Sequence, residues 1–547
     1  MKKDSFIKGM FAAYAAIVIT KLLGALYSIP FYDIIGENGG VIYSCVYNIY
    51  TLFLDISTCG IPIAVSIIIS EYHTLGRYKS ERKAYSIAFR IVTALSLLTF
   101  TAMQVFARSL SLYFLRDMSE GASPEAITLG IRIIALCMLI VPFLSLRRGL
   151  LQGYKYVAAS SRSQIIEQLI RIIVALAGSY ITVRVLDLGE EAGVNIAFTG
   201  TVLGALVSLI YVSVKSRSVK KEMLAYDSDL SDEISSGVII IKLISICVPI
   251  IFVSLTISIY SVVDMKLILV GLHNLGYGDA ETQVIASVAS TWAPKICMLI
   301  SALPTGIVSS IVPFMAESNA EKNREVVGAR LNQALGVLLV VSVPMAAGMI
   351  LLRQPLYTLF YNQSQYGPSI LALLVIVNLI GGITSVMSST LQSIGFGRAV
   401  FLCTFAGIVI NVSLDLPLIY LYDRIGFPSY LGAATASIIG QLVTVLIQTA
   451  VLKRRYRYSG APLRRNLVKI LIATIIMTAA VLLILIIWPA AQYRGVKMIT
   501  QFAVYALVGI VIYFIFIYFS GTAENILGKK ELNSLLEKFH IRTSSLQ

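Results

Sequence analysis

Stretches of about 20 apolar residues recur along the entire chain, and each is long enough to cross a lipid bilayer as a helix. Hydrophobic residues make up 57% of the chain and charged residues 13%, whereas soluble domains have roughly 45–50% and 25%. The chain is therefore predicted to be an all-α polytopic membrane protein. If each apolar run forms one span, there are about 14 transmembrane helices, near residues 11–35, 41–70, 84–115, 126–146, 157–183, 193–214, 238–264, 284–316, 331–352, 368–393, 399–421, 430–452, 467–488 and 499–520.

The formal net charge of +15 is explained by the loops that connect these spans. With the N-terminus in the cytoplasm, the inner connections are basic, as in EYHTLGRYKSERK, KSRSVKK and KRRYRYSGAPLRR. The outer connections, such as GENGG and DLGEEAG, are poor in lysine. Membrane proteins retain Lys and Arg on the cytoplasmic side. The alternation therefore predicts that both termini are cytoplasmic, and the charge requires no nucleic acid partner.

Three pairs of segments recur in the same order at an offset of about 245 residues. The pairs are ARSLSLYFL with LRQPLYTLF, IPIAVSIIISEY with LPTGIVSSIVPFMAES, and RRGLLQGYKY with SSTLQSIGFG. Internal duplication of this kind is typical of secondary transporters that rock one helix bundle against another. The predicted organisation is two pseudo-symmetric six-helix lobes with additions, namely an N-terminal lobe (1–214), a cytoplasmic linker (215–237), a C-terminal lobe (238–453), an extra helix pair (454–520) and a cytoplasmic tail (521–547).

Ionisable residues lie near the middle of several predicted spans, where a charge costs at least about 2.5–3.5 kcal/mol. They are Lys21 in the first helix, Asp55 in the second and Lys295 in the eighth, while Asp264 and Lys266 lie nearer the outer end of the seventh. If helices one, two, seven and eight face one another, these residues line one hydrated cavity. Lys295 has no acidic neighbour in its segment, STWAPKICMLISALP, which suits an anionic substrate such as a phosphate. For Lys21 and Asp55, a buried ion pair between helices one and two is the alternative.

A polar stripe runs along the otherwise apolar fifth helix at spacings of three and four, formed by Ser160, Ser163, Gln164, Glu167, Gln168 and Arg171. Glu167 and Arg171 are an i,i+4 pair of favourable orientation. They are candidates for gating or ion coupling, together with Asp264 and Lys266. Such a stripe more often bonds to neighbouring helices of its own bundle, and we favour that interpretation.

The sequence lacks the motifs of nucleotide-driven, metal-dependent and nucleophilic chemistry. The segment GTAENILGKK has the wrong spacing for a nucleotide-binding loop and lacks its Ser or Thr. The histidines His73, His273 and His540 are far apart, with no HExxH motif and no Cys/His cluster, and GxSxG does not occur. We therefore expect no enzyme, no catalytic residue, no metal, no cofactor and no ATPase subunit.

The sequence resembles a known family in three segments, TKLLGALYSIPFYDIIGENG, YNIYTLFLDISTCGIPIAVS and SLRRGLLQGYKYVAASSRSQIIEQLIRII. They are similar to the polysaccharide-exporter branch of the multidrug/oligosaccharidyl-lipid/polysaccharide (MOP) superfamily, and within it to the stage V sporulation protein B group and its MurJ-type lipid II flippases. The likeness covers residues 5–520, and RGxLQG with SQxxEQxxR is its most specific part. It implies two six-helix lobes around a cavity, a further helix pair that forms a lipid-facing groove, and alternating access.

The resemblance also implies binding residues. MurJ-type flippases place basic residues in helices one, two and eight, where the pyrophosphate of the substrate is expected to bind. Lys21 falls at the arginine of their RxLG motif, and Lys295 matches the basic residue of helix eight. Tyr27 and Asp55 stand where those proteins have further basic residues, so this cavity is less cationic. A lipid-linked glycan other than lipid II, such as a teichoic or capsular precursor, is therefore open.

The sequence thus predicts a monomeric flippase for an undecaprenyl-pyrophosphate-linked cell-wall glycan, with membrane lipids as its other partners. The driving force is the membrane potential, worth about 2.3 kcal/mol per charge per 100 mV, or a coupling cation at Asp55 and Asp264. Two alternatives stay open. One is a cation-coupled multidrug exporter, and the other is a membrane-embedded glycan polymerase or ligase.

Overall fold

The structure, a computed structural model, describes residues 6–58, 60–115, 120–225, 234–320, 324–456, 458–491 and 494–527. Every regular element in these ranges is helical. Among these described residues, twelve helical spans are long and apolar enough to cross a membrane, and shorter apolar stretches lie in α1 (Phe6–Leu26) and α9 (Ser236–Asn274). Together they follow the predicted spans along the chain. The prediction of an all-α polytopic membrane protein is confirmed.

The chain forms two compact units, residues 1–295 with 412–433 and residues 296–411 with 434–547. These boundaries differ from the predicted lobe boundaries at 214, 238 and 453, so the two six-helix lobes stay a prediction. Of the predicted tail, α19 (Thr522–Leu527) is described, and residues 528–547 lie outside the described residues.

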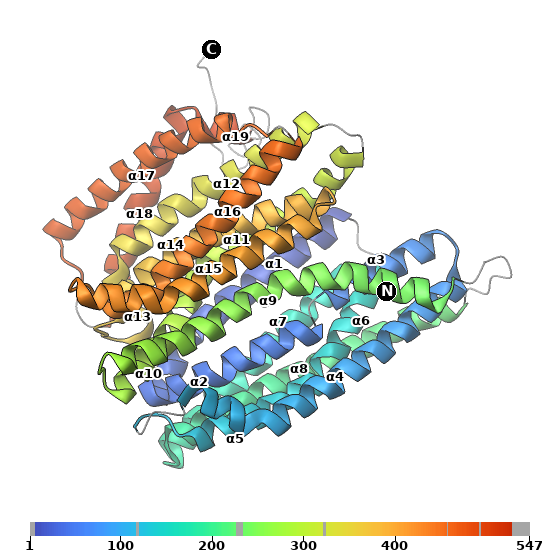
Figure 1. The fold of residues 1–547 in the computed structure, drawn as a ribbon, viewed down its shortest axis with the longest axis horizontal. Helices are drawn as coiled ribbons and strands as arrows, with labels where there is room; N and C mark the ends of the chain where they lie inside the picture. Colours follow the sequence, from blue (N-terminus) through green and yellow to red (C-terminus); the bar gives the residue numbers. More distant parts are fainter. Residues whose placement is uncertain are drawn as a thin grey trace. The chain divides into compact units, whose positions relative to one another are not determined.

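The first unit is built mainly from the helices that precede Lys295 (Figure 1). In it α7 packs against both α1 and α8, and α3 packs against α6. Its remaining elements are α2 (Ser28–Thr58), α3 (Ile61–Thr74), α4 (Tyr78–Leu115), α5 (Pro124–Ala135), the 3₁₀ turn η1 (Leu136–Leu139), α6 (Val141–Gly153), α7 (Val157–Tyr180), the π-helical turn η2 (Ile181–Val185), α8 (Gly189–Ala225), α10 (Asp279–Ser287) and the π-helical turn η3 (Val288–Trp292).

Two glycines set the breaks in the first helices. Gly36 lies inside α2 with φ 65° and ψ −172°, and this non-helical residue marks the turn between the first and second predicted spans. Gly60 has φ 82° and separates α2 from α3. Both angles favour glycine, since a Cβ atom disfavours positive φ. Pro62 lies in the first turn of α3, where the missing N–H of proline has no helical partner to lose.

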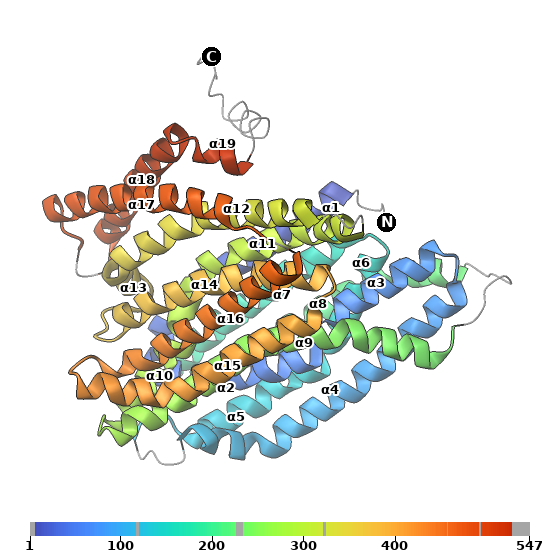
Figure 2. The same cartoon turned by 45° about the horizontal axis from the view of Figure 1, so that its top comes forward.

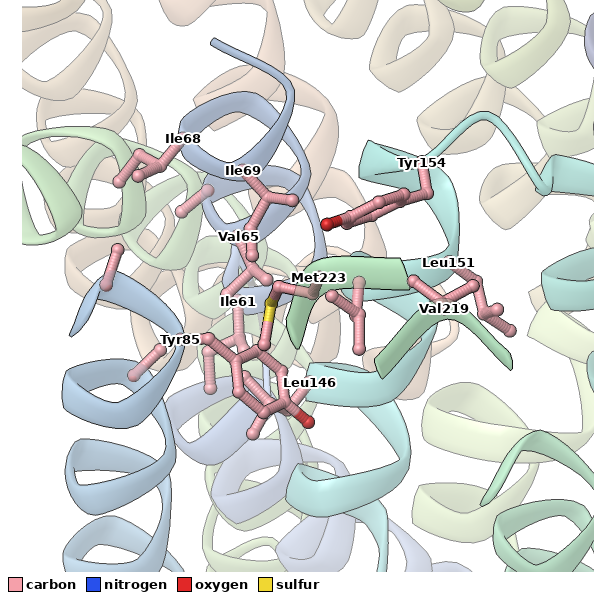
Figure 3. Close-up of a cluster of buried hydrophobic side chains, with 14 of the residues drawn as sticks. Ile61, Val65, Ile68, Ile69, Tyr85, Leu146, Leu151, Tyr154, Val219 and Met223 are labelled. Carbon is pink, nitrogen blue, oxygen red and sulfur yellow. The ribbon is translucent and has the colours of Figure 1, made fainter. Parts of the chain in front are cut away.

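The glycines of the RGxLQG segment allow α6 to lie very close to α3. A Cβ atom on Gly149 would lie 2.8 Å from the carbonyl oxygen of Pro62, and one on Gly153 would lie 3.1 Å from that of Ser66. Figure 3 shows the core beside this contact, where side chains of α3, α4, α6 and α8 meet. Its members include Val65, Ile69, Tyr85, Leu146, Leu151, Val219 and Met223. The most specific part of the family resemblance is therefore also a packing motif.

The second unit contains the helices of the C-terminal part, and α11, α15 and α16 each contribute residues to both units. In it α17 packs along α12 and α18, which lie side by side with it in both views (Figures 1 and 2). The phenolic oxygen of Tyr513 donates to the carbonyl of Val340 at 2.7 Å, which ties α18 to α12. The elements are α11 (Ala293–Ala320), α12 (Arg324–Leu351), α13 (Arg353–Tyr361), α14 (Gly367–Ser393), α15 (Gly397–Arg424), η4 (Ser429–Leu431), α16 (Gly432–Tyr456), α17 (Ala461–Ile487) and α18 (Val496–Phe519).

Candidate substrate-binding site

The four helices that were expected to face one another meet within the first unit. Helix α2 packs against α1, α9 and α10, and the π-helical turn η3 packs against α2 and α9. These elements correspond to predicted helices one, two, seven and eight. They bring Tyr27, Asp55, Asp264 and Lys295 onto one set of packed helices.

Pro294 shapes the turn that precedes Lys295. In an α-helix the N–H of residue 294 would bond to the carbonyl of Ser290, but proline has no N–H to donate. The carbonyl of Ser290 instead accepts a hydrogen bond from the Ser261 hydroxyl of α9 at 3.2 Å. Just before the proline, the N–H of Ala293 bonds to Val288, five residues back, and closes η3. Such π-helical insertions are frequent at functional sites.

The ammonium group of Lys295 is enclosed by aromatic rings. Its Nζ lies 4.0 Å from a ring centroid of Trp292, 4.2 Å from that of Tyr43 and 5.5 Å from that of Tyr27. Each distance lies within the roughly 6 Å that a cation–π interaction requires. The residue is 5% exposed, and Nζ has no hydrogen-bond partner in the described part of the chain. We name this group of four residues the lysine cage. In this structure Lys295 is closed in by rings and does not line an open cavity.

Trp292 is held in place by the backbone of α2. Its Nε1 donates to the carbonyl of Gly40 at 3.2 Å, and its ring meets that of Tyr32 edge-on with centroids 4.7 Å apart. A Cβ atom on Gly40 would lie 3.1 Å from Nε1 of Trp292 and 3.0 Å from the Tyr32 ring. The hydroxyl oxygens of Tyr27 and Tyr43 are 3.0 Å apart and hydrogen bonded. The cage is therefore fixed by contacts that leave no room for a side chain at position 40.

A seam of hydroxyl and amide groups extends from the cage along α2. The Ser44 hydroxyl lies 2.9 Å from that of Ser290 and 2.6 Å from that of Thr291. The Ser261 hydroxyl donates to the side-chain oxygen of Asn48 at 2.7 Å. Polar groups inside a bilayer need partners within the protein. These bonds join α2 to α9 and η3.

Asp55 lies at the other end of this seam. Its carboxylate accepts a hydrogen bond from the Ser258 hydroxyl of α9 at 2.5 Å. Lys21 is partly buried on α1, which packs against α7 and α2. The structure therefore brings Tyr27 to Lys295 and gives Asp55 a partner on α9. The participation of Lys21 in the same site stays a prediction.

Asp264 lies against an acidic residue that the sequence analysis did not single out. Asp415 of α15 is buried, and its carboxyl group lies close to that of Asp264. Two carboxylates at close range repel each other, so the pair favours uptake of a proton or a cation. We name these two residues the carboxyl pair. Asp415 is the single acidic residue of its predicted span, so the rule that selected Asp55 also selects it.

Lys266 lies beside the C-terminal end of α4. Its Nζ donates to the carbonyl of Phe114 at 3.5 Å and lies 5.4 Å from the centroid of the Tyr113 ring. Within the described ranges, no group of three or more His, Cys, Asp or Glu side chains is arranged to hold a metal ion.

The polar stripe of α7 bonds to neighbouring helices, as favoured from the sequence. Arg148 of α6 donates from Nη2 to the Glu167 carboxylate at 2.8 Å and to the Ser208 hydroxyl at 3.1 Å, and from Nε to the Ser163 hydroxyl at 2.7 Å. Among the described residues, the ion pair of Glu167 is with Arg148 and not with Arg171. Arg171 lies one turn further along α7, with a buried Nε. These contacts hold α6, α7 and α8 together.

An all-helical membrane fold with ionisable side chains packed between its spans is typical of secondary transporters. A solved structure described as "Lipid II flippase MurJ, inward closed conformation" has this fold. It matches 96% of this chain and 99% of that chain with a TM-score of 0.64 at 16% identity.

The sequence comparisons agree with the fold. A family model described as "Polysaccharide biosynthesis protein" matches residues 6–276, and the MatE model matches residues 249–416. "Lipid II flippase MurJ" of Bacillus subtilis (strain 168) is 27% identical over 537 residues, which cover 96% of this chain and 97% of that protein. "Stage V sporulation protein B" of the same organism is 24% identical over 477 residues, 83% of this chain and 85% of that protein. Together these matches support the flippase branch of the MOP superfamily for this chain.

Proposed function

We propose that the protein is a flippase that moves an undecaprenyl-pyrophosphate-linked cell-wall glycan precursor, lipid II or a related lipid-linked oligosaccharide, across the bacterial plasma membrane by alternating access. It acts as a monomer with both termini in the cytoplasm and performs no covalent chemistry. Relatives whose names describe flippases support this class of substrate. The observation on which the proposal rests is the lysine cage.

The cage holds the Lys295 amine without a hydrogen-bond partner or carboxylate in the described part of the chain. The groups that face Nζ of Lys295 are ring faces, and a desolvated cation–π contact is worth about 2 kcal/mol. An ammonium group has three N–H donors, and a hydrogen bond to a charged group is worth about 1.5–3 kcal/mol. A pyrophosphate that reaches Nζ would therefore replace weak contacts with stronger ones. An anion gains from this site, whereas a cationic drug would meet a like charge.

Substrate entry requires the cage to open, because Lys295 is almost fully enclosed. Tyr27 lies at the break between α1 and α2, and Trp292 lies in the π-helical turn. Both positions depart from regular α-helix, so small backbone changes there can move the rings. The hydroxyl groups of Tyr27 and Tyr43 bond to each other in the closed site and offer hydrogen bonds to a sugar or phosphate when it opens.

The membrane potential can drive outward movement of the anionic head group, at about 2.3 kcal/mol per charge per 100 mV. The carboxyl pair offers a second source of energy, since two adjacent carboxyl groups can bind a proton or another coupling cation and release it when they separate. Transport in proteoliposomes with an imposed potential, compared with an imposed proton or cation gradient, separates the two.

The proposal is tested in bacteria depleted of their own flippases. We expect Lys295→Met, and Lys21→Ala combined with Lys295→Ala, to abolish translocation at normal protein abundance, while Lys295→Arg retains part of it. Lys497→Gln, on an exposed residue of α18, is the matched charge control and should behave as the unmodified protein. Normal growth of both Lys295 variants would contradict the proposal.

A cation-coupled multidrug exporter is the second candidate, favoured by the MatE match and by the carboxyl pair. In that case Asp264→Asn and Asp415→Asn abolish export of cationic compounds, and the lysine variants leave it intact. A glycan polymerase or ligase instead forms new glycosidic product in purified liposomes. A flippase changes only the sidedness of its substrate.

A further inference from the structure

The second unit contains a cavity, lined by both polar and apolar groups, that no part of the proposed cycle uses. Its volume is about 550 Å³, and it lies between α13 and the turn that follows α17. The alternation of basic loops predicts that both segments are on the outer side of the membrane. The polar side chains that line the cavity are Gln354, Thr358, Gln363, Ser364 and Gln365.

The opposite wall of the cavity is fixed in place. It consists of Ala490 and Ala491, and the side chain of Gln501 holds this segment from α18. The Gln501 amide accepts from the N–H of Ala491 at 2.8 Å and donates to the carbonyl of Pro489 at 2.9 Å. Gln501 is 1% exposed, and Tyr505 beside it donates to the carbonyl of Trp488 at 2.6 Å. The cavity therefore has a preformed wall.

A second cavity of about 590 Å³ lies beside the first and shares the lining residue Gln354 with it. It lies between α12 and α17 and is mainly apolar, with Ala347, Ile350 and Leu351 in its lining. Arg353 also lines it and is the one ionised side chain among the described lining residues of the two cavities. The two cavities, which we call the groove, together present an apolar space, a guanidinium group and a group of amides.

We propose that this groove is an outer-face site that holds the lipid-linked glycan after translocation, an inference that rests on the proposed function. The prenyl chain lies against α12 and α17, Arg353 binds the phosphate, and the amide and hydroxyl groups bind the sugar. Each part of the ligand meets the chemistry that suits it, because guanidinium groups pair with phosphate and uncharged amides exchange hydrogen bonds with hydroxyl groups. The site delays the return of the product to the lysine cage.

The two tryptophans of the chain allow the two sites to be measured separately. Trp292 belongs to the lysine cage, and Trp488 precedes the alanine wall of the outer site by two residues. Trp292→Phe leaves Trp488 as the reporter of the outer site, and Trp488→Phe leaves Trp292 as the reporter of the cage. The full chain in nanodiscs is titrated with a ten-carbon prenyl pyrophosphate, either bare or carrying a disaccharide, and fluorescence is followed.

With Trp488 as reporter, we expect the disaccharide probe to bind more tightly than the bare one. Gln354→Ala with Gln365→Ala should weaken the disaccharide probe about tenfold and leave the bare probe unchanged, since two neutral hydrogen bonds are lost. Arg353→Gln should weaken both probes about threefold, because this residue is exposed. Lys497→Gln is the control on the same side. Equal binding of the two probes, or no effect of the glutamine substitutions, would overturn the outer site.

The two proposals fail differently in this experiment. If Trp488 reports binding and Trp292 does not, the outer site stands and the lysine cage is not a pyrophosphate site. The reverse result removes the outer site only. A measurement without tryptophan substitution uses a disaccharide probe with a diazirine on its sugar and the unmodified chain. We expect crosslinks in residues 354–365 and 490–491, and crosslinks confined to other segments would contradict the assignment.

Discussion

Replacing Arg148 with methionine should destabilise the first unit by about 3 kcal/mol. Breaking one partner of a buried ion pair costs about 3–5 kcal/mol. The lower end of this range applies, because the two side chains are not fully buried and water reaches the remaining charge. The Arg148 side chain is 11% exposed and that of Glu167 is 18% exposed. Arg148 also donates to the hydroxyls of Ser163 and Ser208, at 2.7 and 3.1 Å, and both bonds are lost in the variant.

A double-mutant cycle separates the ion pair from these other bonds. Glu167→Leu alone should cost about 2 kcal/mol, because Arg148 keeps its two serine partners. Replacing both residues by apolar ones should cost less than the sum of the single changes, by about 2 kcal/mol, since neither charge is then left without its counterpart. Arg162→Met is the control, because Arg162 is an exposed residue of α7, the helix that carries Glu167, and its loss should change stability by at most about 0.5 kcal/mol.

The measurement is equilibrium unfolding of the full chain in mixed micelles by increasing mole fraction of SDS. Trp292 lies in the first unit, so its fluorescence in a Trp488→Phe background follows the unfolding of that unit. A loss below about 1 kcal/mol for Arg148→Met would refute the reasoning. It would show that Arg171, one turn further along α7, takes over Glu167 as the i,i+4 pattern predicts.

Gly40→Ala should displace Trp292, since the added Cβ would lie 3.1 Å from Nε1 of that tryptophan. We expect a red shift of the Trp292 fluorescence emission and loss of transport at normal protein abundance. An unchanged emission spectrum would count against the cage geometry. Gln283→Ala should speed hydrogen exchange of the Ala122 amide by about 5- to 30-fold, because the N–H of Ala122 donates to the Gln283 side chain at 2.8 Å and its loss lowers local stability by about 1–2 kcal/mol. Equal exchange rates in the two proteins would contradict this. Burial raises the pKa of Tyr458 to about 12 from its usual 10. The stability that its neutral form provides is therefore complete below pH 10 and is lost as the pH rises towards 12. Replacing this tyrosine with phenylalanine should flatten the pH dependence of the free energy of unfolding between pH 10 and 12, and an unaltered curve would refute this.

The spans and the lysine in helix eight could be predicted from the sequence because they depend on local composition. A run of about 20 apolar residues is most stable as a helix in the bilayer, whichever other helices pack against it. A charge within such a run is costly wherever the helix packs, so Lys295 and Asp55 were visible as exceptions. In the sequence analysis the meeting of helices one, two, seven and eight was a condition for these residues to share a site, and the helix contacts now meet that condition. Lys295 could thus be assigned to a site without knowing which side chains surround it.

The partners of these residues could not be predicted, because they come from distant segments. The hydroxyl that bonds Asp55 is 203 residues away, and the tyrosines beside Lys295 lie on two other helices. Aromatic residues are frequent throughout this chain, so no pattern distinguishes the two in the cage. The same holds for Glu167, where the local spacing favoured Arg171 and the fold supplies Arg148. Helical spacing gives the face of a residue, whereas its partner depends on which helix covers that face.

Pro294 explains how one local feature generates much of the site. Its missing N–H leaves the carbonyl of Ser290 available, and the hydroxyl of Ser261 bonds to it. The π-helical turn that ends beside this proline contains Trp292, which bonds to the carbonyl of Gly40 and lies over Lys295. A regular α-helix would rotate this tryptophan relative to the lysine, because residues in a π-helical turn are spaced differently around the axis. The enclosed cation and the polar seam along α2 are therefore two consequences of a single residue that cannot donate a hydrogen bond.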